Sequence, residues 1–541
     1  MSICWRRRGW KTFALDLLSS LIFAGLLVPP TVRCRERQNN LPPQHYSDTG
    51  TSYRDLVRQS ALSSQRIASP GERPVPQYLY SVHNQGNLQM TITNWGQFGV
   101  ITERGVPDPV TGEVVNGLVY PRNIGVSYFN GDIAVGAIAG TDTLVTTWEE
   151  FSPDVAPFGE FQMASIDANR SFFSRDAHSI FDLTCTYFDT LKDTPFVPIN
   201  RFDNRFHKPL GLRVIQRSMA WSGPNLDDFI IINYELGNTG LHFLHDVYVR
   251  FDEESFIYDL ILDSLGSQLV GFLPDWHITL ECGVPDTVNV AYVTSYTGFL
   301  HDFLDDWDTR SPRAAVGIQV LGMPADSLRL NYNWYAPSFG GFGTDTAATW
   351  GPRRRGTVED PFRQIGESWG RPEGDANEYY VMAHPEFDYD QMYAAVDFSS
   401  RGWLPPSVIG WLTSLIPFGI DAKASLSFGP IDLPPRASTE FTIAVVGGDS
   451  VHVHPNDFLD RWDIEYPDAY YHSLDFSRLA ENARWAKWVY DNPGFDTDGD
   501  GYRGKFRICN GDTFWYEGDG VPDFRADVPP LAPKVHVLTR E

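Results

Sequence analysis

The chain has 541 residues, of which 42% are hydrophobic, so it is long and apolar enough for several folded domains and disorder throughout is excluded. Its formal net charge of −26 repels phosphate backbones, so we expect no nucleic-acid partner. The five cysteines are far apart and lack CxxC spacing, which indicates neither a zinc site nor a disulfide framework and leaves room for one bridge that spacing cannot assign.

Residues 1–33 are predicted to be a signal peptide. Arg6, Arg7, Arg8 and Lys11 precede an apolar run over residues 17–28, which is the order of the basic and hydrophobic regions of export signals. An uncleaved anchor is the alternative. Because no other run reaches 18 apolar residues, we expect no further membrane segment and a secreted or cell-surface location. Residues 34–76 are polar and mixed, and they predict a flexible linker.

Strands and turns dominate residues 77–454, which we divide into a β-rich domain (77–210) and a β-sandwich domain (211–454). Residues 133–151 predict a hairpin that turns at Gly140. Residues 228–251 and 424–448 predict two more strand pairs, with connections at 238–240 and 434–435. Strands without alternating helices predict a mainly β fold of one or more antiparallel β-sandwiches.

One late α-helix is expected within a helical segment at residues 455–494. Residues 475–494 put Leu479, Ala483, Ala486 and Tyr490 on one stripe, the period of an amphipathic helix. Residue 473 or 475 can cap its start, and the Asn-Pro-Gly sequence at 492–494 ends it. We expect this helix to dock on the sheets.

The sequence GFDTDGDGYRG at residues 494–504 predicts a calcium site. Carboxylates about 5 Å apart repel by roughly 3 kcal/mol per pair at an effective dielectric near 20, and a bound cation offsets this cost. Asp496, Asp498 and Asp500 take positions 1, 3 and 5 of an EF-hand-like loop, Gly501 takes the sharp turn and Tyr502 offers its carbonyl. Position 12 is an arginine rather than the usual glutamate, so the second half of the loop departs from that pattern.

A second acidic stretch, EGDGVPDFRAD at 517–527, completes a predicted calcium-loop segment at 495–527, followed by a tail or truncated linker at 528–541. Asp519 and Asp523 are expected ligands there, and Asp512 or Glu517 could supply the missing one. The DxDxDG and DGVPD strings resemble the calcium loops of thrombospondin type 3 repeats and dockerin-like modules. The alternative is a solvated acidic turn. The predicted ligand set is Asp496, Asp498, Asp500, Tyr502, Asp512, Asp519 and Asp523.

Catalytic signatures such as HExxH, GxSxG, Walker and GxGxxG patterns are missing, which leaves enzymatic activity open and favours a non-catalytic role. The acidic stretches 252–255 and 301–308 could contain an acid/base pair, with an exposed loop as the alternative. His452 and His454 alternate onto one face and suit either a metal or ordinary packing. Residues 332–355, rich in glycine and aromatics, predict a long surface loop.

Several strings resemble a group of large uncharacterised exported bacterial proteins, many of which carry type IX secretion sorting tails. They include TNWGQFG (93–99), DDFIIINYELGNTG (227–240), PEGDANEYYVMAHPEFDYDQ (372–391) and FGPIDLPPRASTEFTIAVVGGD (428–449). The resemblance implies location and architecture, and no activity.

Together these features predict a secreted, calcium-stabilised β-sandwich protein of the cell surface with a structural or adhesive role, and cell-surface proteins or glycans as partners. The alternative is a carbohydrate-active protein, either a glycan-binding module or a glycoside hydrolase. Abundant tryptophan, acidic clusters and the long aromatic loop favour that alternative.

Overall fold

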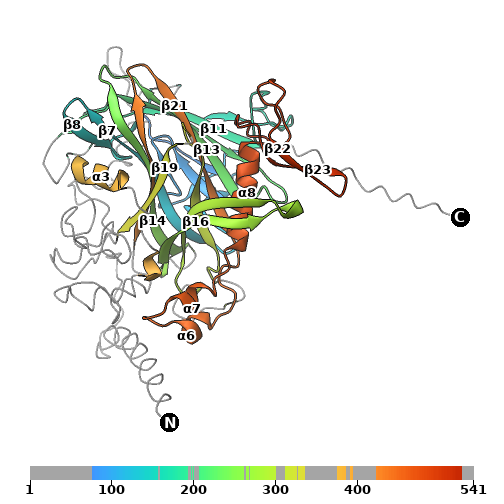
Figure 1. The fold of residues 1–541 in the computed structure, drawn as a ribbon. Helices are drawn as coiled ribbons and strands as arrows, with labels where there is room; N and C mark the ends of the chain where they lie inside the picture. The colour runs from blue at the N-terminus through green and yellow to red at the C-terminus, as the bar shows by residue number, and fades with distance from the viewer. Residues whose placement is uncertain are drawn as a thin grey trace, which may run out of the picture. The chain divides into compact units, whose positions relative to one another are not determined.

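Two antiparallel sheets dominate the described part of the chain (Figure 1). The structure is a computed structural model that describes residues 76–526, except for 156, 158, 193–196, 198, 200–205, 261–263, 267, 300–306, 308–310, 326, 336–373, 385–389 and 394–421. All of these residues belong to the unit Tyr53–Glu541. The predicted signal peptide, the predicted tail from residue 528 and nearly all of the predicted linker therefore lie outside the described residues.

The larger sheet has ten described strands, with the two longest near its centre. In spatial order its path is β1 (Tyr80–His83), β2 (Gln89–Thr93), β3 (Gln97–Phe98), β7 (Val126–Ala139), β14 (Leu244–Asp259), β20 (Lys423–Leu433) and β19 (Arg329–Tyr335). The strands that pair beside this path are β6 (Leu118–Val119), β8 (Asp142–Thr146) and β15 (Ser264–Gly266).

The second sheet has nine described strands, again all antiparallel. Its path is β10 (Gln162–Ala164), β11 (Phe181–Phe188), β12 (Leu212–Ala220), β13 (Phe229–Asn238), β21 (Ser438–Gly448), β18 (Ala315–Gly322), β17 (Pro285–Ser295) and β16 (Gln268–Thr279), with β9 (Ser152–Pro153) beside β11. Two small hairpins stand apart from both sheets: β4 (Val106–Pro107) with β5 (Val114–Val115), and β22 (Lys505–Cys509) with β23 (Asp512–Glu517).

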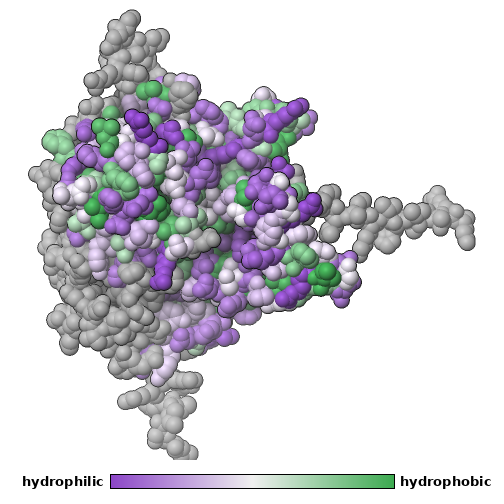
Figure 2. Space-filling view, turned by 45° about the horizontal axis from the view of Figure 1, so that its top comes forward, coloured by the Kyte–Doolittle hydropathy of each residue, from purple (hydrophilic) through white to green (hydrophobic). Residues whose placement is uncertain are grey.

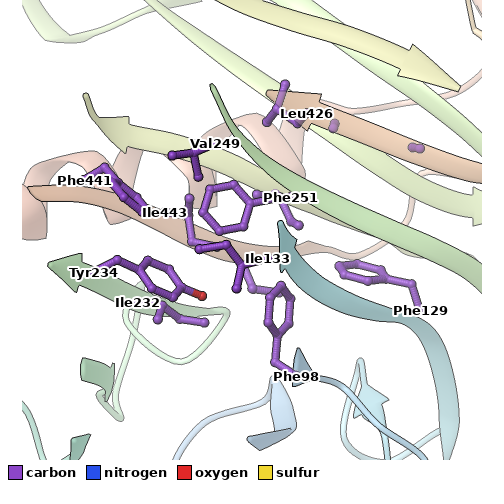
Figure 3. Packing of buried hydrophobic residues seen from close by; sticks show 14 of the residues in the cluster. Phe98, Phe129, Ile133, Ile232, Tyr234, Val249, Phe251, Leu426, Phe441 and Ile443 are labelled. Atoms are coloured by element: carbon purple, nitrogen blue, oxygen red, sulfur yellow. The ribbon is translucent and has the colours of Figure 1, made fainter. Parts of the chain in front are cut away.

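The main hydrophobic core lies between the two sheets. Because side chains alternate along a strand, β14 turns Val249 and Phe251 toward the nine-stranded sheet, where they meet Tyr234, Phe441 and Ile443. Figure 3 shows side chains from both sheets pointing toward one another across this layer. Facing sheets with a shared core confirm the predicted mainly β, antiparallel sandwich.

The predicted late helix is α8 (Ser477–Tyr490), and it covers the outer face of the nine-stranded sheet. Leu479, Ala483 and Ala486 are fully buried, as their spacing predicts. Close approach requires a glycine, because a Cβ at Gly448 would lie 2.4 Å from the Leu479 backbone nitrogen. The side chain of Asn482 donates a 2.8 Å hydrogen bond to the Gly447 carbonyl. The helix therefore forms a third layer with its own apolar cluster.

Besides α8, the described residues contain three shorter helices and two 3-10 turns that the sequence did not place individually, although two of the helices lie within the predicted helical segment 455–494. These elements are α3 (Asp375–Met382), α6 (Asp457–Arg461), α7 (Asp468–Tyr471), η1 (Glu281–Gly283) and η3 (Gln391–Tyr393). None of them spans more than eight residues, too short for a clear helical period. Every helix in the described ranges is too short or too polar to cross a lipid bilayer.

Two of the three predicted strand pairs are connections between sheets. The hairpin β7–β8 forms as expected and turns at Gly140, whose φ is 67°. In contrast, β13 pairs with β12 and β21, whereas β14 pairs with β7 and β20. The chain likewise changes sheet between β20 and β21. The turn residues at 238–240 and 434–435 therefore lie where the chain passes from one sheet to the other. The predicted pairing was wrong because the pattern of a strand does not reveal which strand it pairs with.

The boundary predicted between residues 210 and 211 does not separate two sandwiches. Strand β11 precedes this boundary and β12 follows it, and the two pair over eight residues from Phe181↔Ala220 to Phe188↔Arg213. Similarly, β7 pairs along β14. The predicted domains 77–210 and 211–454 therefore contribute strands to the same two sheets.

On the face in Figure 2, hydrophobic residues form small groups among hydrophilic ones.

Candidate calcium site and a buried charged face

The predicted calcium loop follows α8 and is closed by its own backbone. Oxygen atoms of Asp496, Asp498 and Asp500 all lie within 4.8 Å of one another. The Asp496 carboxylate accepts hydrogen bonds from the amides of Gly499 (2.8 Å) and Gly501 (3.0 Å), which fold the loop around it. Gly501 has a φ of 94°, a conformation suited to glycine, at the position where the sequence predicts a sharp turn.

The hairpin β22–β23 returns the chain to this loop. Lys505 pairs with Glu517 at the open end of the hairpin, next to the loop, whereas Asp512 lies at its turn. Directly after the hairpin, the Asp519 carboxylate accepts a hydrogen bond from the backbone amide of Thr497. The two acidic, glycine-rich stretches therefore meet at one place.

Two more carboxyl groups lie beside this meeting point. Asp491, at the end of α8, accepts 3.2 Å hydrogen bonds from the Gly520 amide on both of its oxygens. Burial, reinforced by the nearby charges of Asp519 and Asp523, raises the pKa of Asp491 to about 6. Burial likewise raises the pKa of Asp523 to about 6. Additional negative charge is therefore unfavourable here unless a cation compensates it.

The seven predicted ligands do not all lie together in the structure. Asp496, Asp498 and Asp500 form the cluster with mutual ligand distances, and Asp519 contacts the same loop. The Tyr502 amide donates to Asp500 Oδ1 at 2.7 Å. Asp523 is only 6% exposed.

Asp512 is the predicted ligand that lies farthest along the hairpin. It is at the far end of β22–β23, about 13 Å from the loop by strand rise.

Sequence reasoning missed Asp491, whose signal is its position five residues before Asp496. Clustered carboxylate oxygens are hard donors, and this donor set fits Ca²⁺ by ligand type.

A disulfide between Cys282 and Cys509 fastens the hairpin to the sandwich. Cys282 lies in η1, the turn between β16 and β17, and the Arg507 guanidinium donates to its carbonyl at 3.2 Å. The rings of Trp488 in α8 and Phe514 in β23 lie 6.3 Å apart. The acidic segment is thus held from both sides, by covalent and aromatic contacts.

A second cluster of ionisable groups lies on the outer face of the ten-stranded sheet. The register places Asp132 of β7, Asp252 of β14 and Ser425 of β20 side by side, and Arg250 and Lys423 adjoin them. Arg250 Nη2 lies 2.8 Å from Asp252 Oδ2, and Lys423 Nζ lies 3.3 Å from the same oxygen. Lys423 also lies 3.7 Å from Asp132. Both cations and both aspartates are nearly inaccessible to solvent.

The pKa values of the two buried aspartates are shifted in opposite directions. Burial raises the pKa of Asp132 to about 7, and the Lys423 charge offsets this only in part. Burial also acts on Asp252, but the charges of Arg250 and Lys423 together hold the pKa of this carboxyl below its usual value. Asp252 is therefore the ionised centre of the network. Paired groups with separated pKa values are typical of functional sites and also of structural ion networks.

Helix α3 covers part of this face. Arg250 forms an ion pair with Glu378 of α3. The last turn of the helix receives hydrogen bonds from the sheet: Met382 O accepts from Asn331 Nδ2 (3.0 Å) and Ser427 Oγ (2.8 Å). The side chain of Asn333 donates to Val381 O at 3.2 Å. Polar side chains of the strands thus satisfy the carbonyls that a helix C-terminus leaves unpaired.

The acidic stretch 252–255 does not form an exposed acid/base pair. Asp252 belongs to the buried network, and the neighbouring Glu253 points into the sandwich, where it accepts a 2.9 Å hydrogen bond from the Ile318 amide. Burial raises the pKa of Glu253 well above its usual value. Apart from residue 307, the stretch 301–308 lies outside the described residues, as does 336–355 of the predicted long loop.

The two histidines of the VHVH sequence lie in different surroundings. His452 is buried and its Nε2 lies 2.7 Å from the Ser295 carbonyl, whereas His454 is exposed. Burial lowers the pKa of His452 to about 4. This residue is therefore a neutral, hydrogen-bonded core side chain.

Comparison with known proteins identifies no family. No protein-family model and no curated protein matches the chain. Among solved structures, a putative aldose 1-epimerase from Escherichia coli K12 aligns with 69% of this chain and 99% of its own, at 9% identity and a TM-score of 0.22. A likeness of this size carries no argument about function. The fold itself defines the class as an antiparallel β-sandwich protein with an attached acidic segment.

Proposed function

We propose that the chain is an exported, calcium-stabilised β-sandwich protein with a structural or adhesive role at the cell surface, related to the exported bacterial group that its sequence resembles. The observation that carries the proposal is the cluster of Asp496, Asp498 and Asp500 within 4.8 Å, with Asp519 bonded to the same loop. Like charges this close favour a bound divalent cation, and extracellular modules bind calcium with a Kd of roughly 10⁻⁴ to 10⁻³ M.

The disulfide supports export. Bridges such as Cys282–Cys509 persist in oxidising compartments and are rare in reducing ones. The remaining described cysteine, Cys185, is buried and unpaired. This distribution agrees with the basic and apolar N-terminus expected of a signal peptide.

Two features favour the structural or adhesive role over a glycoside hydrolase. Edge strand β16 is covered, because the side chains of Gln391 and Asp390 accept hydrogen bonds from the amides of Val270 (3.0 Å) and Phe272 (2.7 Å). Part of the abundant tryptophan that suggested a carbohydrate-active protein is used in packing: Trp95, Trp221 and Trp334 are at most 3% exposed.

Calcium titration of the purified chain tests the proposal. We expect calorimetry to detect binding, and calcium at ten times its Kd to stabilise the fold by about 1.4 kcal/mol. Chelation should lower the melting temperature and expose residues 495–527 to protease. The variant Asp498→Asn should lose most of the binding heat.

The matched control is Asp460→Asn, which removes one exposed carboxylate from α6, remote in sequence from the loop. Its calcium affinity should equal that of the unaltered chain. Equal binding by both variants, or a melting curve that EGTA leaves unchanged, would remove the calcium proposal. Cell fractionation and protease treatment of intact cells test the proposed location independently.

A further inference from the structure

A groove of about 370 Å³ opens on the outer face of the ten-stranded sheet, beside the charged face described above. Three strands line it: Tyr248 comes from β14, Arg329 and Asn331 from β19, and Gly429 and Pro430 from β20; Ser327 and Leu328 complete the wall. A volume of this size is in the range of small-molecule sites.

The shape of the groove depends on a bulge and a glycine. The register of β14 shifts on both sides of Val247, which is the mark of a bulge and re-aims the Tyr248 side chain. A Cβ at Gly429 would lie 2.6 Å from Cδ1 of Tyr248 and 2.7 Å from the Val247 carbonyl. The missing side chain therefore lets the tyrosine ring lie against β20.

A second tyrosine holds the first in place. The rings of Tyr248 and Tyr379 meet edge to face, with centroids 5.7 Å apart. The Tyr379 hydroxyl donates a 2.8 Å hydrogen bond to the Asp246 carbonyl, so α3 anchors the pair to the bulge. The groove thus has a rigid aromatic side, which costs little ordering when a ligand binds.

The polar side of the groove carries one positive charge. Arg329 is exposed and forms no ion pair with any carboxylate in the described part of the chain, although the protein has 69 acidic residues. The amide nitrogen of Asn331 is committed to Met382 O, which fixes the orientation of this side chain. Ser327 adds an exposed hydroxyl.

We propose that this groove binds a saccharide that carries a carboxylate, of the uronate type. A pyranose ring offers an apolar face for Tyr248 and hydroxyls for the serine and asparagine, and its carboxylate matches the planar fork of a guanidinium. Asp252 and Glu378 are already paired with Arg250, so they do not neutralise Arg329. The proposal goes beyond the structural role and does not depend on the calcium site.

Calorimetric titration with trigalacturonate tests it, with the methyl-esterified trisaccharide as the uncharged match. Both titrations contain EGTA, so that calcium bound to the probe or to the acidic loop plays no part. We expect the acid to bind and the ester to bind at least tenfold more weakly, and we expect high salt to weaken the acid alone.

Three variants of the groove and one control variant assign the site. Arg329→Gln should weaken trigalacturonate binding at least tenfold, and Tyr248→Ala should weaken it several-fold, whereas Tyr248→Phe keeps the ring and should bind normally. Arg175→Gln removes another exposed arginine, from a loop before β11 of the other sheet, and should leave affinity unchanged. The proposal is overturned by an acid that does not bind at millimolar concentration, by an ester that binds equally well, or by equal losses in the Arg329 and Arg175 variants.

Discussion

The backbone amide of Thr497 donates a hydrogen bond to the carboxylate of Asp519, 22 residues further along the chain. This contact joins the first acidic loop to the second, and the hairpin between them sets the register that makes it. The candidate calcium site is therefore composite.

The composite site predicts unequal effects of two aspartates that the sequence treats alike. Asp519→Asn should weaken calcium binding roughly tenfold, because it removes a charge in contact with the loop. Asp512→Asn should have no effect, because Asp512 lies at the far end of the hairpin. Calorimetric Kd values of the two variants decide the matter, and a larger loss for Asp512→Asn would contradict the arrangement.

Loss of the disulfide should destabilise the fold. Cys282 and Cys509 are separated by 227 residues, and in the chain-entropy account closing so long a loop stabilises by up to about 5 kcal/mol. We expect the double variant Cys282→Ser/Cys509→Ser to unfold at lower urea, with a free energy of unfolding reduced by roughly 2–5 kcal/mol. Dithiothreitol should lower the midpoint of the unaltered chain and leave that of the variant unchanged. If complete reduction left the urea midpoint of the unaltered chain unchanged, the disulfide would not stabilise the fold.

Removal of the central cation of the buried face should be costly. Arg250→Met leaves Asp252 and Glu378 without their common partner, and breaking a buried pair in this way costs about 3–5 kcal/mol. The control Arg213→Met breaks the half-exposed pair with Glu235 and should cost at most about 1 kcal/mol. Urea denaturation of both variants measures the difference, and similar costs would mean that burial does not govern this network.

The raised pKa of Asp132 predicts a pH dependence of stability. Since burial lifts this pKa from its usual value to about 7, the folded state holds a proton that the unfolded chain releases. Its contribution to stability is complete at pH below about 4 and is lost as pH rises to about 7.

Asp132→Asn should abolish this loss. Between pH 5 and 8 the free energy of unfolding of the variant should therefore rise relative to that of the unaltered chain, by on the order of 2–4 kcal/mol. Urea unfolding at a series of pH values measures the gain. Asp460→Asn, an exposed substitution, serves as the control and should follow the unaltered chain. A gain that stays constant from pH 5 to pH 8 would show that Asp132 is ionised throughout this range and would contradict the raised pKa.

Local features of the sequence were sufficient for the elements whose physics is local. Gly140 between two β-branched runs predicts the β7–β8 turn, and the spacing of Leu479, Ala483 and Ala486 predicts α8 and its buried stripe. The helix ends at Tyr490, just before the Asn-Pro-Gly sequence. The DxDxDG string predicts a tight loop with converging carboxylates for the same reason, since all of its members lie within a few residues.

Strand partners were not readable, because any apolar strand can pair with many others. The runs at 228–251 look like a hairpin, yet β13 and β14 lie in opposite sheets, and only the packing of both against one core decides this. The sequence by itself determined a mainly β chain, one amphipathic helix and one acidic loop, because alternation, helical period and charge repulsion act between near neighbours. Only the tertiary structure decided which of the many acids meet which cations. Asp132, Arg250 and Lys423 come together through the register of three strands that are distant in sequence, and cross-strand contacts of that kind leave no local trace.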